Sequence, residues 1–318
     1  MMPEHDRGRI IAIVGPTASG KTEVAILVAE ALGGEVVSAD SMQVYRGMDI
    51  GTGKPTAEQR ARVRHHLIDI IDPQEPFSVA DYQQRAERAI EDIWSRGRQP
   101  LLVGGSGLYV RAVIDGLSFP MAPPDPELRR RLTNEARARG AAALHARLAS
   151  IDPCAASRIH PNDEKRIVRA LEVYEQTGVP ISRLQAVDRE RRPRYNTRQF
   201  GLTWPRCALY QRIEERVDRM IEAGLVEEVR ALLDRGLGED LVPMRGLGYA
   251  QIIPYLRGQC TLAEAVRVLK RDTRRFAKRQ LTWFGADRRI EWLDMSGLGG
   301  PREAAELIVR KSEARWES

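Results

Sequence analysis

The sequence predicts an α/β fold in which helices flank a parallel sheet, together with an inserted all-helical domain. In the first third of the chain short apolar strands alternate with amphipathic helices, which is typical of a doubly wound sheet. A glycine-rich motif stands between the first strand and the first helix. After Gly116 a proline-rich segment leads into arginine-rich helical sequence with no convincing strand. We therefore assign residues 1–117 and 200–318 to an α/β core with C-terminal helices, and residues 118–199 to the insertion.

The first part of the core contains three predicted strands and two predicted helices. The strands are short and rich in β-branched residues, and the helices carry apolar residues at helical spacing. The first helix ends at a Gly-Gly pair, a usual stop signal. In chain order the elements are the strand Arg9–Val14, the helix Lys21–Leu32, the strand Glu35–Ala39, the helix Ala80–Arg96 and the strand Pro100–Val103.

The C-terminal part of the core is predicted to return to the sheet and then to form long helices. Phe200–Thr203 is expected to be a strand, and Cys207–Arg235 and Thr261–Phe284 are expected to be helices. A surface helix is expected at the C-terminal end. Helical spacing divides Thr261–Phe284 into two faces. The apolar face consists of Leu262, Ala265, Leu269, Phe276 and Leu281, and the basic face of Arg267, Arg271, Arg274 and Lys278.

The composition predicts a protein of the cytoplasm that does not contact a membrane. No apolar run approaches the roughly 20 residues that span a bilayer, and the polar N-terminus is unlike a signal peptide. Cys154, Cys207 and Cys260 form no CxxC pair, so we expect reduced, packed cysteines and neither a zinc site nor a disulfide framework. The net charge of +6 suits a polyanionic partner such as nucleic acid. We expect a monomer.

The glycine-rich motif after the first strand matches GxxxxGK[ST], the phosphate-binding P-loop. Its glycines let backbone N–H groups point at phosphate oxygens, and the N-terminus of the following helix adds partial positive charge. Lys21 supplies a full charge, and the hydroxyl of Thr22 is suited to ligate Mg²⁺. The core is therefore predicted to be P-loop NTPase-like and to bind a diphosphate through Gly15, Pro16, Thr17, Ala18, Ser19, Gly20, Lys21 and Thr22.

Asp40 ends the second strand, at the edge of the sheet where open α/β folds bind ligands. Its carboxylate is suited either to hold Mg²⁺ through water or to accept a proton as a general base. The polar, glycine-rich segment that follows, up to Pro55, is predicted to be a loop over the site. The third strand ends in Gly104-Gly105-Ser106 and lacks the Asp that an NTPase uses for Mg²⁺. The other candidate for that strand, Leu67–Asp72, has carboxylates but alternates rather than running apolar.

Three functional classes fit these residues. The first is an enzyme that uses pyrophosphate as a leaving group. The second is a nucleotide-binding enzyme, either an NTPase or a small-molecule kinase, which the missing Asp makes a weaker fit. The third is a non-catalytic RNA-binding protein that uses its P-loop for regulation.

A series of ordered motifs resembles the tRNA dimethylallyltransferase family. The motifs are GPTASGKT, DSMQVYRGMDIGTGKP, HHLIDIIDP, FSVADY and LLVGGSGLY, then HPND at 160–163, RGLGY at 245–249 and KRQLTWF at 278–284. The resemblance covers residues 9–293. Departures are slight: Ser106 stands where the family usually has Thr and keeps the hydroxyl, and Met42 occupies a variable position.

The resemblance implies that a dimethylallyl group passes from its pyrophosphate to N6 of the adenosine 3′-adjacent to the anticodon in tRNAs. It implies Mg²⁺ as the cofactor and a flipped adenine, since chemistry on a base requires the base out of its stack. Arg166 and Arg216 are implied to reach the pyrophosphate. The implied catalytic residues, with the first as general base and the others acting on the leaving pyrophosphate, are Asp40, Lys21, Thr22 and Ser106.

The resemblance also implies an extended contact with the anticodon stem-loop of tRNA. The basic face of Thr261–Phe284 is interpreted as a surface for RNA phosphates, and His65, His66 and His160 are interpreted as structural. The residues implied to contact tRNA are Asp40, Ser41, Met42, Gln43, Ser106, Arg129, Lys165, Arg166, Ile167, Val168, Arg169, Arg245, Gly246, Leu247, Gly248, Tyr249, Lys278, Arg279 and Gln280.

Overall fold

The chain divides into two compact units, which we call the core unit and the helical unit. The computed structural model describes residues 8–117, 125–190 and 194–314. The core unit comprises residues 1–114 and 194–318, and the helical unit comprises residues 115–193. Among the described residues, no helix is both long enough and apolar enough to cross a bilayer.

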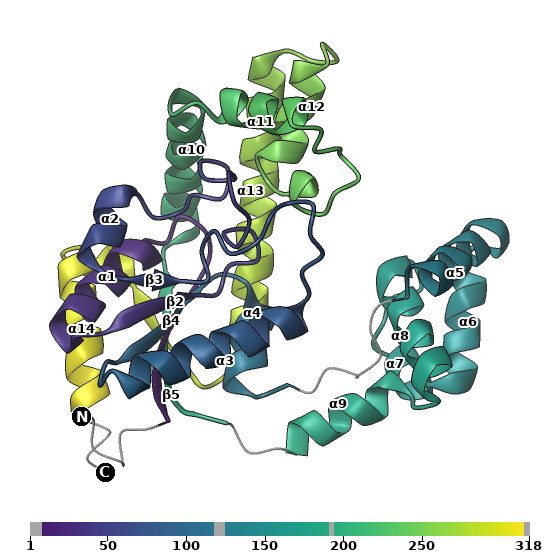
Figure 1. Ribbon diagram of the computed structural model, residues 1–318, viewed down its shortest axis with the longest axis horizontal. Helices are drawn as coiled ribbons and strands as arrows, with labels where there is room; N and C mark the ends of the chain where they lie inside the picture. Colours follow the sequence, from purple (N-terminus) through teal and green to yellow (C-terminus); the bar gives the residue numbers. More distant parts are fainter. Residues whose placement is uncertain (1–7, 118–124, 191–193, 315–318) are drawn as a thin grey trace. The chain divides into compact units, whose positions relative to one another are not determined.

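A six-stranded sheet lies at the centre of the core unit, and its strands all pair in parallel (Figure 1). The strand order is β3-β2-β4-β1-β5-β6. Because parallel strands end at the same edge of a sheet, the segments that follow β1, β2 and β4 are brought together. The strands are β1 (Arg9–Val14), β2 (Glu35–Ser38), β3 (His65–His66), β4 (Pro100–Gly104), β5 (Asn196–Thr203) and β6 (Ile290–Asp294).

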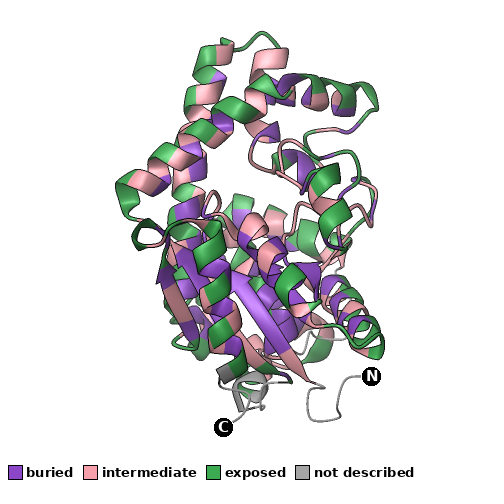
Figure 2. Ribbon diagram, turned by 90° about the vertical axis from the view of Figure 1, so that its left-hand side faces the viewer, coloured by how far each residue is buried: buried purple, intermediate pink, exposed green. Residues whose placement is uncertain are grey.

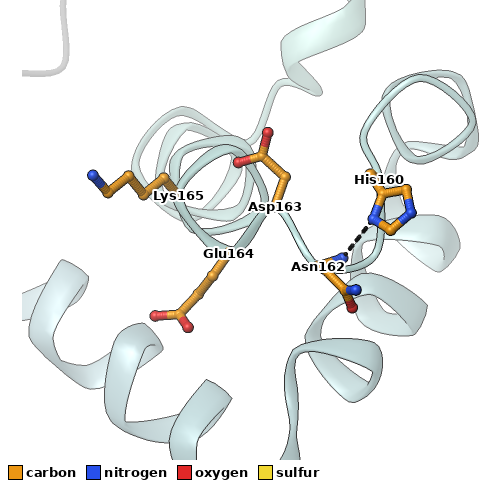
Figure 3. A pocket seen from close by; sticks show the side chains of 5 residues that line it. All are labelled: His160, Asn162, Asp163, Glu164 and Lys165. Atoms are coloured by element: carbon orange, nitrogen blue, oxygen red, sulfur yellow. Dashed lines mark hydrogen bonds between the residues drawn. The ribbon is translucent and has the colours of Figure 1, made fainter. Parts of the chain in front are cut away.

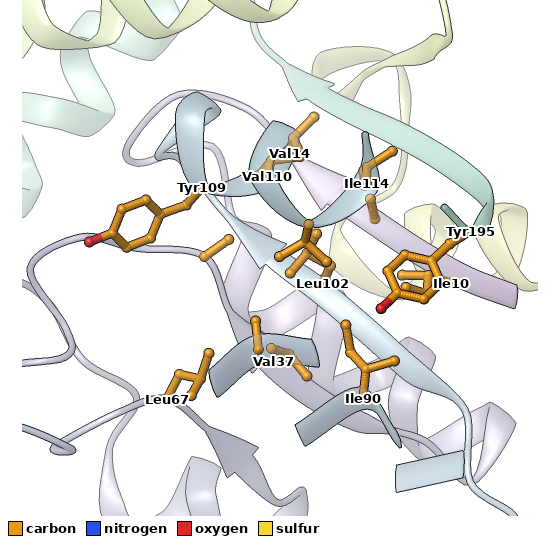
Figure 4. Close-up of a cluster of buried hydrophobic side chains, with 14 of the residues drawn as sticks. Ile10, Val14, Val37, Leu67, Ile90, Leu102, Tyr109, Val110, Ile114 and Tyr195 are labelled. Atoms are coloured by element: carbon orange, nitrogen blue, oxygen red, sulfur yellow. The ribbon is translucent and has the colours of Figure 1, made fainter. Parts of the chain in front are cut away.

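Helices cover both faces of this sheet, because successive side chains of a strand point to opposite faces. On β1, Ile10, Ala12 and Val14 join one hydrophobic cluster, which Figure 4 draws, while Ile11 and Ile13 join the other. In Figure 2 the buried residues are concentrated in the strands. The first cluster is completed by α3 (Val79–Ser95) and α4 (Gly107–Ile114), and the second by α1 (Lys21–Leu32) and α14 (Pro301–Ala314).

A second group of helices in the core unit packs around its own hydrophobic cluster, together with the loop after β2. The predicted helix Cys207–Arg235 is wrong at its middle, because the chain breaks into two helices at Gly224, which has a left-handed φ of 98°. The helices of this group are α10 (Arg206–Glu222), α11 (Leu225–Asp234), α12 (Tyr249–Leu256) and α13 (Leu262–Gly285). Shorter elements of the core unit are α2 (Ala57–Arg62) and the 3-10 turns Pro243–Arg245 and Met295–Gly297.

The helical unit packs five helices around a cluster of aliphatic side chains. Leu132, Leu144, Leu148, Ile167 and Leu171 are at most 1% exposed. Aspartates cap three of the helices, at residues 125, 152 and 163, and so satisfy the first free N–H groups. The helices are α5 (Pro126–Arg139), α6 (Ala141–Ile151), α7 (Pro153–Ala156), α8 (Glu164–Thr177) and α9 (Ile181–Glu190).

Several strand predictions differ from the structure. β5 begins at Asn196 rather than Phe200, so sequence assigned to the insertion 118–199 already belongs to the sheet. β6 was not predicted, since Ile290–Asp294 is short and carries two acidic residues. Leu67–Asp72 is not a strand, because Leu67 and Asp69 adopt left-handed φ values of 63° and 58°.

The prediction that the cysteines are packing residues is wrong for two of the three. Cys154 and Cys207 are exposed, and Cys260 is half-buried. Both exposed cysteines lie in the first turn of a helix on its outer side, which the spacing of apolar residues did not reveal.

Candidate active site

The P-loop, Gly15–Thr22, turns sharply between β1 and α1. Gly15 has a φ of 139°, and a Cβ there would lie 2.5 Å from the carbonyl oxygen of Leu202 on β5. Gly20 caps α1 in the left-handed region, with a φ of 97°, and Ala18 also has a positive φ, of 63°. The loop therefore needs its glycines for conformation and for close approach to β5.

Three side chains from the C-terminal half of the chain brace the backbone of the P-loop. The indole Nε1 of Trp204 donates to the carbonyl oxygen of Ser19 at 3.1 Å. Arg212 stacks on Trp204, and its Nε donates to the carbonyl oxygen of Ala18 at 3.0 Å. The Oε1 atom of Gln280 accepts the N–H of Thr17 at 2.8 Å. Trp204 and Arg212 were not predicted from the sequence, because their partners in the P-loop lie 185 and 194 positions away along the chain.

Two cations meet at this edge of the sheet. Lys21 donates from Nζ to the carbonyl oxygen of Pro16 at 2.6 Å, and burial, the neighbouring Arg216 and, in the opposite direction, Asp40 set its pKa at about 7 instead of 10.5. Burial also lowers the pKa of Arg216, which lies against Gly53. Neither cation forms an ion pair with a described residue. A desolvated cation without a carboxylate partner favours a bound anion.

Asp40 follows β2 and lies within electrostatic range of both cations. Its Oδ1 accepts the N–H groups of Met42 at 2.8 Å and Gln43 at 3.4 Å, which fixes the side chain. Its Oδ2 accepts no hydrogen bond from any residue in the described ranges. One carboxylate oxygen is thus held in place by the backbone while the other stays available for a proton or a cation.

Two stacked tyrosines lie within electrostatic range of this carboxylate. The ring centroids of Tyr82 and Tyr109 are 3.9 Å apart, and the Tyr82 hydroxyl donates to the carbonyl oxygen of Ser38 at 3.1 Å. Burial, with the charge of Asp40, raises the pKa of both phenols. Both phenols therefore stay neutral beside Asp40.

Ser106 connects the end of β4 to the end of β2. Its Oγ accepts the N–H of Ser41 at 3.0 Å, and its own N–H donates to the carbonyl oxygen of Ala39 at 3.1 Å. Gly104 leaves no room for a Cβ against Ala39. The absence of a side chain at this strand end therefore lets Ser106 approach the segment that carries Asp40.

A carboxylate anchors the middle of the loop that follows Asp40. Glu228 on α11 accepts the N–H groups of Asp49, Ile50 and Gly51 at 2.7–3.0 Å and the hydroxyl of Tyr249 at 2.8 Å. Burial and Glu228 raise the pKa of Tyr249. Tyr249, an implied tRNA contact, is fully buried and supports the loop instead.

The buried cation Lys54 holds the same loop at its far end. Its side chain is 2% exposed, and its Nζ donates to the carbonyl oxygen of Tyr45, to Asp49 and to Asp69 at 2.5–2.6 Å. Because Glu228 and Lys54 fix the loop from both sides, Gly53 is held against Arg216.

In the helical unit, a buried carboxylate holds two of the arginines implied to contact tRNA. Glu172 is 0% exposed, and it binds Nε of Arg129 at 2.8 Å and Nη1 of Arg169 at 2.7 Å. Ile167 and Val168 point into the hydrophobic cluster of the unit. The spacing of apolar residues on α8 indicates this burial of Ile167 and Val168, whereas the family resemblance assigns both residues to tRNA contact.

The HPND motif, at 160–163, lies at the start of α8, where it lines a polar hollow in the helical unit (Figure 3). His160 accepts the N–H of Asn162 on Nδ1 at 3.1 Å. Lys165 is exposed and points away from His160. Arg166 is exposed beside Asp163, with 3.5 Å between Nε and Oδ2.

Known proteins are similar to this chain over most of its length. The family described as IPP transferase matches residues 43–288. A tRNA dimethylallyltransferase of Desulforudis audaxviator is 57% identical over 304 residues, which are 96% of this chain and 97% of the relative. A second, of Symbiobacterium thermophilum, is 53% identical and covers 96% of both chains.

This chain belongs to the tRNA dimethylallyltransferase family.

Solved structures of this family have the same fold. The full-length tRNA isopentenylpyrophosphate transferase from Bacillus halodurans is 44% identical, with a TM-score of 0.71 over 98% of this chain and 100% of that one. A eukaryotic dimethylallyltransferase acting on tRNA is 27% identical, with a TM-score of 0.75 over 90% of this chain and 73% of that one. The resemblance to the dimethylallyltransferase family and the α/β fold with a parallel sheet are thus confirmed, and the chain is a transferase of this family.

On α13 the exposed basic face differs by one member from the prediction. Arg267, Arg271 and Lys278 are exposed, but Arg274 is half-buried and bound to Glu214 at 2.5 Å. Arg275 takes its place on the outer face. Phe276, assigned to the apolar face, is half-buried, because Thr273 and Ala277 form the buried stripe next to it.

The remaining residues that the family resemblance assigns to tRNA contact have mixed surroundings. Arg245 and Arg279 are exposed, whereas Gln280 is buried. Met42 packs against Gly246 in the helical cluster of the core unit, and Leu247 lies half-buried in the same cluster. Gly248 caps α12 with a φ of 94°. Gln43 bonds Ser38 and the carbonyl oxygen of Gly53, so it braces the loop.

Proposed function

We propose that this protein transfers the dimethylallyl group of dimethylallyl pyrophosphate to the exocyclic N6 of the adenosine 3′-adjacent to the anticodon in tRNA. One observation carries the proposal: among the described residues, the desolvated cations Lys21 and Arg216 have no carboxylate in an ion pair, and the nearby Asp40 has one oxygen without a hydrogen bond. A site of this kind binds an anionic leaving group and keeps a base next to it. Membership in the dimethylallyltransferase family supports the identity of the group that is transferred.

The P-loop is proposed to hold the pyrophosphate of the donor. The N-terminus of α1, which directly follows the loop, attracts phosphate oxygens. Lys21 and Arg216 are proposed to face the oxygen on which negative charge grows as its bond to C1 breaks, and so to stabilise the transition state more than the ground state. Burial lowers the pKa of Lys21, and a bound anion would favour its charged form again.

Asp40 is proposed to be the general base. The N6 amine attacks C1 of the dimethylallyl group, the bond between C1 and oxygen breaks, and pyrophosphate leaves with the bonding electron pair. The proton lost from N6 passes to Oδ2 of Asp40, which accepts no other hydrogen bond from the described residues. Ser106 fixes the neighbouring Ser41 N–H and so supports the position of Asp40.

The residues of this site fit a magnesium ion that is held mainly by the donor. Mg²⁺ prefers oxygen ligands and keeps several waters, using one or two protein groups and substrate phosphates. The hydroxyl of Thr22, at the start of α1, makes no hydrogen bond with a described residue, and the described residues contain no cluster of three acidic, histidine or cysteine groups. The hydroxyl of Thr22 would hold the ion, which would supply positive charge at the leaving pyrophosphate.

Mass spectrometry of unmodified tRNA incubated with the protein and dimethylallyl pyrophosphate tests this function. We expect the mass of one dimethylallyl group to appear on the adenosine next to the anticodon, with release of pyrophosphate. The Asp40→Asn variant is the matched control, since its amide oxygen still accepts the Met42 and Gln43 N–H groups. Consumption of ATP in place of dimethylallyl pyrophosphate, with unmodified tRNA, would establish a nucleotide-using enzyme instead.

A further inference from the structure

Strands β1 and β4 end before two loops, the P-loop after β1 and the segment with Ser106 after β4. β1 and β4 pair in parallel up to Val14 and Gly104, the last pair of the register. Beyond this pair the chain has no ladder hydrogen bonds to keep the two loops at a fixed distance. Both loops lead to residues of the proposed site: the P-loop leads to Lys21, and the segment after β4 contains Ser106.

Gln280 on α13 spans the gap beyond the last ladder pair. Its Oε1 accepts the N–H of Thr17 in the P-loop at 2.8 Å, and its Nε2 donates to the carbonyl oxygen of Gly105 at 3.0 Å. The side chain is 6% exposed. A Cβ at position 105 would collide with Nε2, so the contact also accounts for the glycine there.

The chemistry of the two partners fixes the orientation of this amide. A backbone N–H only donates, and a carbonyl oxygen only accepts. The amide oxygen must therefore face Thr17 and the amide nitrogen must face Gly105. A carboxylate or an aliphatic side chain of similar size cannot satisfy both loops.

We infer that Gln280 is a positioning residue that joins the donor-holding P-loop to the segment that orients the base. Gly105 is followed by Ser106, whose Oγ accepts the N–H of Ser41 next to Asp40. Hydrogen bonds thus connect Thr17 through Gln280 to Gly105, and the next residue, Ser106, connects by a further hydrogen bond to the segment of Asp40. This inference rests on the proposed function, in which the pyrophosphate and the base must act on the same reaction.

Direct contact of Gln280 with RNA is the competing assignment. Burial argues against it, because both polar atoms of the side chain are already bonded to protein backbone. The neighbouring Lys278 and Arg279 are exposed on the same helix and are open to RNA. On α13, Lys278 and Arg279 are therefore available to RNA, whereas Gln280 is buried against the two loops.

The test compares Gln280→Ala and Gln280→Glu with a matched control, Gln211→Ala. Gln211 is an exposed amide on α10 that bonds Glu215 on the same helix. Three quantities are measured: kcat at saturating tRNA and donor, the Kd for tRNA, and hydrogen exchange at the amide of Thr17. Hydrogen exchange reports on the P-loop even if the proposed activity proves wrong, so the two failures are distinguishable.

For Gln280→Ala we expect kcat to fall about 10²-fold, as for a misplacement of roughly 1 Å at the reacting groups. The Kd for tRNA should stay at the wild-type value, and exchange at Thr17 should accelerate. Gln280→Glu keeps the acceptor for Thr17 but cannot donate to Gly105, so exchange should stay slow while kcat falls. This variant decides the matter if Gln280→Ala does not fold.

Two results would overturn the inference. A weaker Kd for tRNA with an unchanged kcat would make Gln280 an RNA contact. Wild-type kcat in both variants, with Gln211→Ala behaving in the same way, would leave Gln280 without a part in positioning the loops.

Discussion

In the helical unit, arginines that resemble RNA ligands are held by a buried carboxylate, whereas the two cations at the sheet edge of the core unit form no ion pair with any residue that the structure describes. Glu172 binds Arg129 and Arg169 and so stabilises the helices that carry them. Lys21 and Arg216 are desolvated, and Asp40, whose charge raises the pKa of both, forms no ion pair with either. A charge with a fixed partner serves the fold, and a buried charge that lacks one indicates where a ligand binds.

The largest expected effect concerns the carboxylate with the free oxygen. Asp40→Asn should lower kcat by about 10²–10⁴-fold, the usual contribution of a general base. The fold should persist, since the amide oxygen still accepts the N–H groups of Met42 and Gln43. Single-turnover kinetics with saturating tRNA measures the change, and thermal unfolding serves as the control. Near-normal turnover would remove Asp40 from the mechanism.

Removing one unpaired cation should have the next largest effect. Lys21→Ala should lower kcat/KM for the donor by about 10²–10³-fold, because this variant lacks a charge that faces the leaving group. The Kd for tRNA should change little. Arg147→Ala is the matched control from the paired class, since Arg147 binds Glu135 and Glu175 within the helical unit. Equal losses in both variants would break the distinction between paired and unpaired cations.

The paired class should respond in stability. Burial opposes ionisation of Glu172, but hydrogen bonds from Arg169, the Asp125 N–H and Arg129 outweigh it and lower its pKa. Glu172→Gln should cost less than the roughly 3–5 kcal/mol of a fully buried pair, because Arg129 is 44% exposed. Urea unfolding measures the loss.

The sign of the pH dependence follows from the direction of this shift. The folded state binds fewer protons than the unfolded state near the usual pKa of 4.5, so the stabilisation is complete above it and is lost as pH falls. The difference in urea midpoint between the wild type and Glu172→Gln should therefore be smaller at pH 4 than at pH 7. A constant difference would show that Glu172 contributes nothing as a charge.

The pKa of Lys21 offers a subtler test of the unpaired class. Burial sets this pKa at about 7, against 10.5 for a free lysine, so the folded state binds fewer protons between these values. This group therefore makes the protein more stable as pH rises through that range. Pyrophosphate should restore the charge, so its binding at pH 8 should take up a proton at Lys21. Calorimetry in two buffers measures the uptake, and Lys21→Ala should take up less.

The smallest expected effect concerns α13. Arg267→Ala with Lys278→Ala should lower the slope of log K for tRNA against log salt by about 0.7–0.9 for each RNA phosphate that the protein no longer neutralises. Arg274→Ala is the comparison, since Arg274 is bound to Glu214 and should change stability rather than the salt slope. A wild-type slope in the double variant would make the exposed basic face an ordinary solvated surface.

Sequence sufficed where the signal was local. The P-loop is a run of eight consecutive residues between a strand and a helix, and Asp40 directly follows the next strand. It did not suffice where partners are distant: Gln280, Trp204 and Arg212 bond P-loop residues 263, 185 and 194 positions away. The arginines of α5 and α8 resemble RNA ligands in the sequence because nothing local shows that Glu172 is buried between them.

The chain leaves the core unit at Ile114 and comes back at Arg194, and the N–H of Arg194 donates to the carbonyl oxygen of Ile114 at 3.2 Å. The two residues of the core unit that flank the insertion are therefore hydrogen-bonded to each other, so the insertion is a closed loop with respect to the core unit. The entropy of closing such a loop rises by only about 0.6 kcal/mol for each doubling of its length. A change in the length of the inserted segment should accordingly cost the folding of the sheet little.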